Sequence, residues 1–325
     1  MQNTQEYCLI IIIVVVLAGC SSGYHSSIIE ESSTYERKDS AYQIPIALEG
    51  SLQNPAWSPD GRAIVFTRFR NGYNQGPADL VVYDLENRRV RTLVSDGSDN
   101  INLPGSVWNH ATNQIAFSSS REPHDEIFII NANENPGKEI KITDRVDRVS
   151  YEPSLSQDGQ WVVFESHGVD VEGNGIITKY KIDGTKPYQA LTDVNADCRQ
   201  PNWSPDGHHI LYQALEGGQW DIWVMKPDGT DQRQITAGPG DKTDASFSPD
   251  GEWIVYSADG PNLNFANLFI ERISSGMQIQ LTHSDGYDGA PSWSPKGEKI
   301  VFEASMQAPE ASSGTTIWMI EVPKH

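Results

Sequence analysis

The sequence is short of positive charge. Its 325 residues hold 24 Lys and Arg against 44 Asp and Glu, a formal net charge of −20. Because each contact to a nucleic-acid phosphate calls for a cation, this balance excludes nucleic acid as a partner. Anionic lipid head groups are disfavoured for the same reason. A protein or peptide with a cationic segment is the partner class that the charge favours.

Cysteine is equally scarce, with only Cys8, Cys20 and Cys198 in the chain. We expect Cys8 to leave with a signal peptide and Cys20 to be modified, which leaves Cys198 with no disulfide partner. No pattern of His and acidic residues beside Cys198 marks it as a nucleophile. It is interpreted as a structural thiol.

No hydrophobic run in the chain reaches the length of a membrane-spanning helix, which needs about 20 apolar residues. The run Leu9–Leu17 has instead the length of the apolar region of a signal peptide. The residues around it are atypical in one respect, since Met1–Cys8 contain no Lys or Arg, whereas a signal peptide normally starts with positive charge.

The quartet Leu17-Ala18-Gly19-Cys20 resembles the lipobox of bacterial lipoproteins, in which the cysteine sulfur carries a diacylglycerol and the preceding bond is cut. This resemblance implies a signal peptide over residues 1–19, a lipidated Cys20, and contact with the bilayer through the acyl chains alone. Residues 20–42 are rich in Ser and Glu and poor in apolar side chains. They are predicted to form a flexible tether.

Beyond the tether the chain is built from one repeated unit, whose clearest copies read Trp-Ser-Pro-Asp-Gly or a close variant. The first residue of each copy serves as an anchor, and successive anchors are 51, 47, 48, 44 and 46 residues apart, which is the period of a propeller blade. The six anchors are Trp57, Trp108, Leu155, Trp203, Phe247 and Trp293.

The same register recurs inside each repeat. Nine residues after every anchor stands an aromatic residue, such as Phe66 or Tyr212, and the two residues before it are apolar as well. A strand with apolar residues on both faces is typical of one sandwiched between neighbouring sheets. Two further strands follow in each repeat, except that the sixth lacks a fourth strand. We predict an all-β, six-bladed propeller of four-stranded antiparallel blades, closed by Gln43–Leu48 pairing with the last blade.

These repeats resemble the PD40 repeats of the TolB propeller family over residues 43–325. The resemblance implies a propeller whose face and channel bind another protein or a peptide. We expect no counterpart of the α/β domain that precedes the propeller in TolB, because only the predicted tether separates Cys20 from Gln43.

Candidate binding residues follow from the blade geometry. The long, varied loops should lie on one face, where function concentrates on a rigid scaffold. Residues three before each anchor are expected to ring the channel mouth on that face, and Asp288 is expected to add a further acidic contact there. The six ring positions are Asn54, Gly105, Glu152, Gln200, Asp244 and Ala290.

Two metal sites are weaker hypotheses, and no cofactor is assigned. Asp170, Glu172 and Asn174 imitate the first half of a calcium loop, but Lys181 stands where a bidentate Glu is needed and no helices flank the segment, so an acidic turn is the preferred interpretation. Three loop histidines could share one face and bind a metal, or could be ordinary surface residues. They are His124, His167 and His283.

The function that these patterns favour is a non-catalytic, lipid-anchored binding or scaffold protein of the cell envelope. Ser21 stands where an Asp typically retains lipoproteins in the inner membrane, so in a Gram-negative cell the resemblance implies the outer membrane, at its periplasmic face or the cell surface. The alternative is a propeller lyase or hydrolase acting on envelope or extracellular carbohydrate. Such an enzyme should show convergent His, Arg and acidic side chains at the channel. No catalytic residue is assigned from the sequence.

The lipoprotein assignment is tested by Cys20→Ser. The acylated sulfur is the processing signal, so the variant should lose all incorporation of a fatty-acid analogue and accumulate as unprocessed precursor. Label retained by the serine variant at the wild-type level would contradict the assignment.

Overall fold

The computed structural model describes residues 37–103, 108–133, 138–169, 173–261, 263–307 and 314–323. Cys20, Gly105, Asp170 and Glu172 lie outside these ranges. Every regular element within them is a β-strand, and they contain no helix long and apolar enough to cross a membrane.

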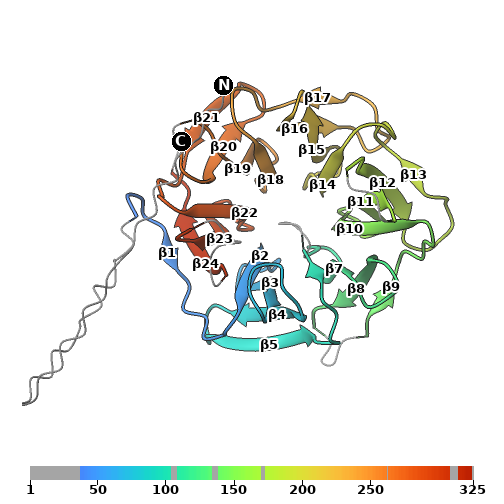
Figure 1. Ribbon diagram of the computed structural model, residues 1–325, viewed down its shortest axis with the longest axis horizontal. Helices are drawn as coiled ribbons and strands as arrows, with labels where there is room; N and C mark the ends of the chain where they lie inside the picture. Colours follow the sequence, from blue (N-terminus) through green and yellow to red (C-terminus); the bar gives the residue numbers. More distant parts are fainter. Residues whose placement is uncertain are drawn as a thin grey trace, which may run out of the picture. The chain divides into compact units, whose positions relative to one another are not determined.

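Six antiparallel sheets of four strands surround a central axis, which confirms the predicted propeller (Figure 1). In each blade the first strand lies nearest the axis and the fourth at the rim. Blade 1 holds β2 (Ser51–Trp57), β3 (Ala63–Phe69), β4 (Ala78–Asp84) and β5 (Arg89–Val94); blade 2 holds β6 (Ile101–Asn102), β7 (Gln114–Ser119), β8 (Glu126–Asn131) and β9 (Ile140–Lys141); blade 3 holds β10 (Arg148–Leu155), β11 (Trp161–Gly168), β12 (Ile176–Lys181) and β13 (Gln189–Ala190).

The remaining blades follow the same order, except that the fourth strand of blade 6 comes from the beginning of the propeller. In blades 2, 3 and 4 the fourth strand has only two residues in the ladder, both exposed at the rim. Blade 4 holds β14 (Cys198–Trp203), β15 (Ile210–Glu216), β16 (Gln219–Met225) and β17 (Arg233–Gln234); blade 5 holds β18 (Lys242–Phe247), β19 (Trp253–Ala258), β20 (Asn267–Arg272) and β21 (Met277–Gln280); blade 6 holds β22 (Tyr287–Trp293), β23 (Lys299–Ser305), β24 (Thr316–Glu321) and β1 (Tyr42–Gln43).

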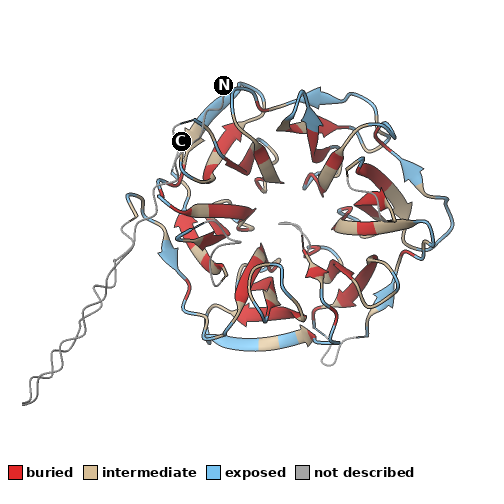
Figure 2. Cartoon of the chain, viewed as in Figure 1, coloured by how far each residue is buried: buried red, intermediate tan, exposed pale blue. Residues whose placement is uncertain are grey.

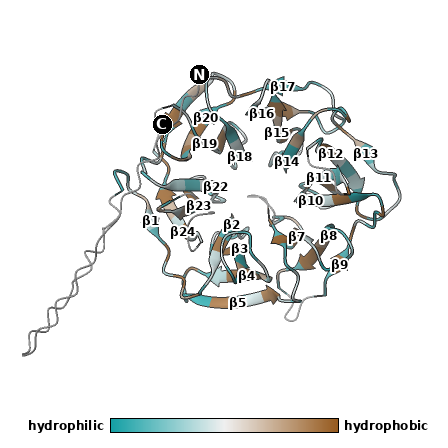
Figure 3. Cartoon of the chain, in the orientation of Figure 1, coloured by the Kyte–Doolittle hydropathy of each residue, from teal (hydrophilic) through white to brown (hydrophobic). Residues whose placement is uncertain are grey.

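The core lies between blades rather than inside one of them. The second strand of every blade is buried along most of its length, and hydrophobic residues gather on it (Figures 2 and 3). On β3, Ile64 and Phe66 pack on the side of blade 6, whereas Val65 packs toward blade 2, and all three are 0% exposed. A strand that is apolar on both faces therefore joins its blade to both neighbours.

The Ser-Pro-Asp-Gly copies form the turns between first and second strands. In blade 1 the Ser58 hydroxyl donates to Asp60 Oδ1 over 2.7 Å, and the same oxygen accepts the Arg62 N–H at 3.0 Å. Gly61 supplies the left-handed φ of 71° that the turn requires. The turn aspartates are thus engaged in local structure.

The ring closes as predicted, but the closing strand is shorter and lies earlier in the chain. Tyr42 and Gln43 pair with β24, and Ile44 N–H donates to Ile317 O over 2.9 Å. The ladder cannot continue through the predicted span Gln43–Leu48, because Pro45 has no N–H. The next residues instead pack against the core that blades 6 and 1 share.

The ordered propeller begins before residue 43, so the tether predicted over 20–42 is too long. Arg37 belongs to the same compact unit as the blades. Its guanidinium lies over the rings of Phe302 and Trp318, 5.4 and 4.9 Å from their centroids. It also donates to both carboxylate oxygens of Asp288, at 2.8 and 2.7 Å, and to Asp39. The side chain is 5% exposed, which makes this contact a clamp on the N-terminal segment.

Replacing Arg37 with Ala should destabilise the propeller strongly. The change leaves Asp288 buried without its cation, and breaking a buried pair costs about 3–5 kcal/mol. Lys38→Ala removes the same charge from an exposed neighbouring side chain and serves as the control. Thermal and denaturant unfolding of the two variants should separate clearly; equal midpoints would show that the Arg37 contact contributes little.

Candidate functional site

The first strands share a feature that repeats around the axis. Three residues before the anchor, the backbone enters the left-handed region at a break in the ladder between the first and second strands. Positive φ is uncommon for residues other than glycine and persists only where the surrounding structure enforces it. The residues are Asn54 (φ 51°), Glu152 (48°), Gln200 (51°), Asp244 (57°) and Ala290 (46°).

These positions lie in the middle of the first strands, so the expectation that they ring the channel mouth is wrong. Asn54 is the fourth of the seven residues of β2, and Gln200 is the third of the six of β14. The side chains of four of them, Asn54, Glu152, Gln200 and Asp244, take part in hydrogen bonds that cross from blade to blade around the axis.

Hydrogen bonds link their side chains from blade to blade. Asn54 Nδ2 donates to Asn102 Oδ1 over 2.7 Å, and Asn102 Nδ2 donates to Glu152 Oε1 over 3.2 Å. Gln200 Nε2 is shared between Glu152 Oε1, at 3.3 Å, and Asp244 Oδ1, at 2.7 Å. Asn102 thus takes the place in blade 2 for which the repeat spacing indicated Gly105.

Blade 6 contributes differently, because Ala290 offers only a methyl group. A Cβ on the adjacent Gly289 would lie 2.0 Å from the Tyr287 hydroxyl, so glycine there leaves room for that ring. Tyr287 and Tyr73 both hydrogen-bond Glu303, whose Oε2 accepts the Asn54 N–H at 2.8 Å. We call the resulting set the channel ring: Asn54, Asn102, Glu152, Gln200, Asp244 and Glu303.

Glu303 belongs to a second recurring position, ten residues after the anchor, that the sequence analysis missed. At three blade junctions this residue accepts the N–H of the left-handed residue of the next blade. Glu165 accepts from Gln200 N at 3.1 Å, and Gln213 accepts from Asp244 N at 3.3 Å. The signal was present in the sequence as Glu or Gln directly after the recurrent aromatic of an otherwise apolar strand.

Two carboxyls of the channel ring, those of Glu303 and Glu152, have raised pKa values. Burial, together with the charge of Asp244, raises the pKa of Glu303 to about 8. The hydrogen bond from the Asn54 N–H lowers this pKa but does not offset the burial. Burial, followed by the charges of Glu165 and Asp244, raises the pKa of Glu152 well above its ordinary value. The channel ring itself holds three carboxyls and no Lys or Arg, so its electrostatics favour a proton or a cation.

A His, an Arg and acidic residues also meet beside the ring, at the junction of blades 3 and 4. His167 Nε2 contacts Glu165, and His167 Nδ1 lies 3.1 Å from Gly173 O. Burial lowers the pKa of His167, but the hydrogen bond and charge of Glu165 outweigh it, so the pKa is raised. Both ring nitrogens of His167 thus have a hydrogen-bond partner, and the residue is only 7% exposed. Arg199 lies nearby and pairs with Asp197 over 2.9 Å.

The other candidate residues are placed as follows. Asp288 is 0% exposed against Arg37, so it is not open to a partner as predicted. Cys198 is buried, and its burial raises the pKa of the thiol to about 11, as a structural thiol requires. Asn174 is exposed. Within the described ranges no group of three His, Cys, Asp or Glu side chains is placed to hold a metal.

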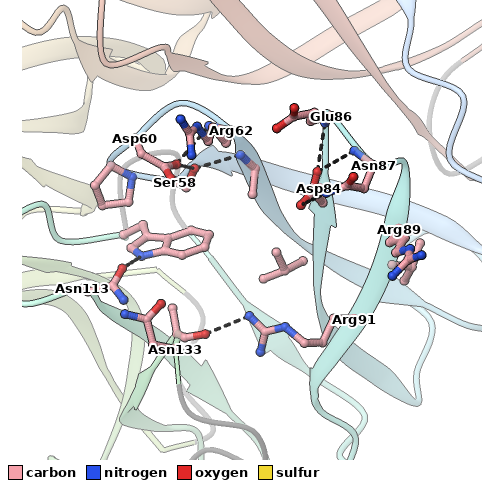
Figure 4. Close-up of a pocket in the computed structure, with 16 residues that line it drawn as sticks. Ser58, Asp60, Arg62, Asp84, Glu86, Asn87, Arg89, Arg91, Asn113 and Asn133 are labelled. Carbon is pink, nitrogen blue, oxygen red and sulfur yellow. Dashed lines mark hydrogen bonds between the residues drawn. The ribbon is translucent and has the colours of Figure 1, made fainter.

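Two cavities lie away from the channel ring. One of about 810 Å³ lies between blades 1 and 2 (Figure 4). Polar groups that line it are hydrogen-bonded within the protein. Asp84 accepts the Asn87 N–H in its own hairpin. Arg91 donates to Ala132 O, and Trp108 Nε1 donates to Asn113 Oδ1. A smaller one of about 360 Å³ is lined by the anchors at the turn end of the axis, including Trp203 and Trp293.

Substituting Glu303 with Gln should raise stability at neutral and alkaline pH. Between about pH 4.5 and 8 the folded wild type holds a proton that the unfolded chain releases, so its stability falls as pH rises through this window. The gain should approach roughly 4 kcal/mol at pH 8 and vanish below pH 4.5. Unfolding midpoints between pH 4 and 9 measure it, with the exposed Glu86→Gln as control. A constant difference between wild type and Glu303→Gln across this range would contradict the assignment.

Known proteins share both the repeat and the fold. Residues 184–311 match the family model described as PD40, TolB beta propeller domain. Dipeptidyl-peptidase 5 of Porphyromonas endodontalis is 37% identical over 109 residues, which cover 33% of this chain and 16% of that protein. The chain spans less than half the length of the curated relatives it matches.

Two solved structures illustrate the range of proteins with this fold. A putative TolB from Agrobacterium tumefaciens superposes with a TM-score of 0.62 at 17% identity, covering 87% of this chain and 93% of that one. Oligogalacturonate lyase from Vibrio parahaemolyticus has a TM-score of 0.55 at 13% identity, with coverages of 89% and 97%. At these identities the likeness concerns the fold alone. The comparisons thus show a PD40 match over residues 184–311 and a six-bladed β-propeller fold shared with these structures.

Proposed function

We propose that this protein is a non-catalytic binding or scaffold protein of the cell envelope, whose channel and long-loop face hold a cationic segment of a protein or peptide. The channel ring carries the proposal, because side chains from successive blades are fixed there by hydrogen bonds and the charged ones are all carboxyls. A rigid acidic site on a chain of net charge −20 attracts cations from a distance and selects against anions. The TolB-like repeats agree with protein binding.

The proposed location rests on the N-terminal residues. Lipidation of Cys20 would attach the propeller to a membrane, and the residues before Arg37 would form the tether. Ser21 favours the outer membrane in a Gram-negative cell. The propeller would then present its channel to partners in the periplasm or at the cell surface.

A propeller enzyme is the second candidate, favoured by the meeting of His167, Glu165, Arg199 and Asp197 beside the channel. Relatives of this fold include a named peptidase and a named lyase. Against an acid–base role, both ring nitrogens of His167 are already hydrogen-bonded and little of the side chain is exposed. Cleavage of an envelope polysaccharide that is lost in His167→Ala would decide for the enzyme.

Neutralising the channel should weaken partner binding, whereas neutralising the turn face should not. Envelope proteins captured by a chain starting at Tyr24 provide the partner, and association and dissociation rates are then measured for Glu152→Gln, Asp244→Asn and Asp250→Asn. Asp244→Asn should slow association and flatten its salt dependence, because it removes an acidic charge that attracts a cationic segment. Glu152→Gln should instead speed dissociation, because Glu152 is protonated in the free protein and the variant removes the carboxylate that would hold the bound segment. Asp250 lies in a turn between first and second strands, away from the channel ring, and its variant is the control. Slowing by Asp250→Asn alone would place the site on the wrong face.

A further inference from the structure

The three carboxyls of the channel ring differ in how completely they are hydrogen-bonded. Asp244 is fully engaged: Oδ1 accepts from Gln200 Nε2, and Oδ2 accepts from the hydroxyls of Ser257 and Thr243 at 2.8 and 3.0 Å. Glu303 bonds the Asn54 N–H and two tyrosine hydroxyls. These two groups are satisfied by the protein itself.

Glu152 is not satisfied. Its Oε1 accepts two long hydrogen bonds, from Asn102 and Gln200, which hold the carboxyl in place. Its Oε2 has less than 1 Å² of accessible surface and accepts no hydrogen bond from the described part of the chain. A buried polar oxygen without a hydrogen-bond partner costs about 1–3 kcal/mol, whether or not it carries a proton, so such a group in a folded protein calls for an ion, water or ligand group.

The surroundings of Oε2 define which group would fit. Glu165 and Asp244 add negative charge near Glu152, whereas the nearby Arg199 is held by both oxygens of Asp197 at 3.0 and 2.9 Å. The complementary group is therefore a cation that donates hydrogen bonds. A guanidinium binds carboxylates best through two parallel bonds, and Oε1 is already occupied by two donors. An ammonium group is compact and can use the single free oxygen.

We infer that the channel binds one primary ammonium group, such as a lysine side chain, with Glu152 Oε2 as its acceptor. The inference rests on the proposed function, since the cationic segment of a partner would deliver the group. Asn102 and Gln200 act as positioning residues that fix Oε1 and so direct Oε2 toward the ligand.

Binding of this group is linked to a proton. In the free protein, burial and the neighbouring carboxylates favour the protonated form of Glu152. A bound ammonium favours the carboxylate, so the carboxyl proton passes to solvent while the ammonium keeps its own three protons. Binding therefore releases up to one proton per site and weakens as pH falls.

Butylammonium chloride titrated into the chain that starts at Tyr24 tests the inference. Calorimetry in two buffers of different ionisation enthalpy measures both affinity and proton release. We expect one saturable site, released protons, and a loss of affinity of about tenfold or more in Glu152→Gln, which places an amide at the ligand and removes the charge. Tetramethylammonium has no N–H and methylguanidinium needs two acceptors, so both should bind more weakly than butylammonium.

Asp144→Asn is the matched control, because it removes one acidic charge from a side chain that is 86% exposed. It should bind butylammonium as the wild type does. Equal affinity in Glu152→Gln, equal loss in Asp144→Asn, or no saturable binding by the wild type would overturn the inference. If the wild type captures a protein partner but not butylammonium, the ammonium site alone fails. If it binds butylammonium but captures no partner, the proposed function fails.

Discussion

The whole molecule depends on second strands that are apolar on both faces. A strand such as β3, with Ile64, Val65 and Phe66 fully buried, cannot be covered by one neighbouring sheet. Each blade needs a partner on both sides, and only a closed ring gives every blade two. The pairing of β1 with β24 follows from this requirement, because without it blade 6 would lack its fourth strand and expose an edge.

Closing the ring brings six first strands toward one axis, and the chain fills that axis with polar groups. The left-handed bulge recurs at the same position of five blades, and the side chains of four of these residues take part in hydrogen bonds that cross from blade to blade. Buried acceptors such as Glu165, Gln213 and Glu303 then bind the backbone N–H groups that the bulges withdraw from the ladders. The rigidity of the site and its perturbed protonation thus have one origin, namely polar groups held at the centre of an apolar scaffold.

The fold could be predicted from the sequence because the same strand pattern recurs in every repeat. The anchors and the aromatic nine residues later recur six times, so single departures such as Leu155 do not hide the pattern. The site was only partly predictable. Counting back from the anchor found Asn54, Glu152, Gln200 and Asp244, but blade 2 departs from the common spacing, and Asn102 was missed. Asp288 was misjudged because its partner, Arg37, lies 251 residues away in a segment whose composition indicates a tether.

The Arg37 clamp also sets how the propeller responds to pulling. Tension applied through the residues before 37 reaches the ring first at the ion pair with Asp288, and then at the short pairing of Tyr42 and Gln43 with β24. These contacts lie in blade 6, where the first strand of the chain is joined to the last strands by non-covalent contacts. A sustained load at the N-terminus would therefore act on blade 6 before any other blade, and the Arg37 contact adds to the resistance of that junction.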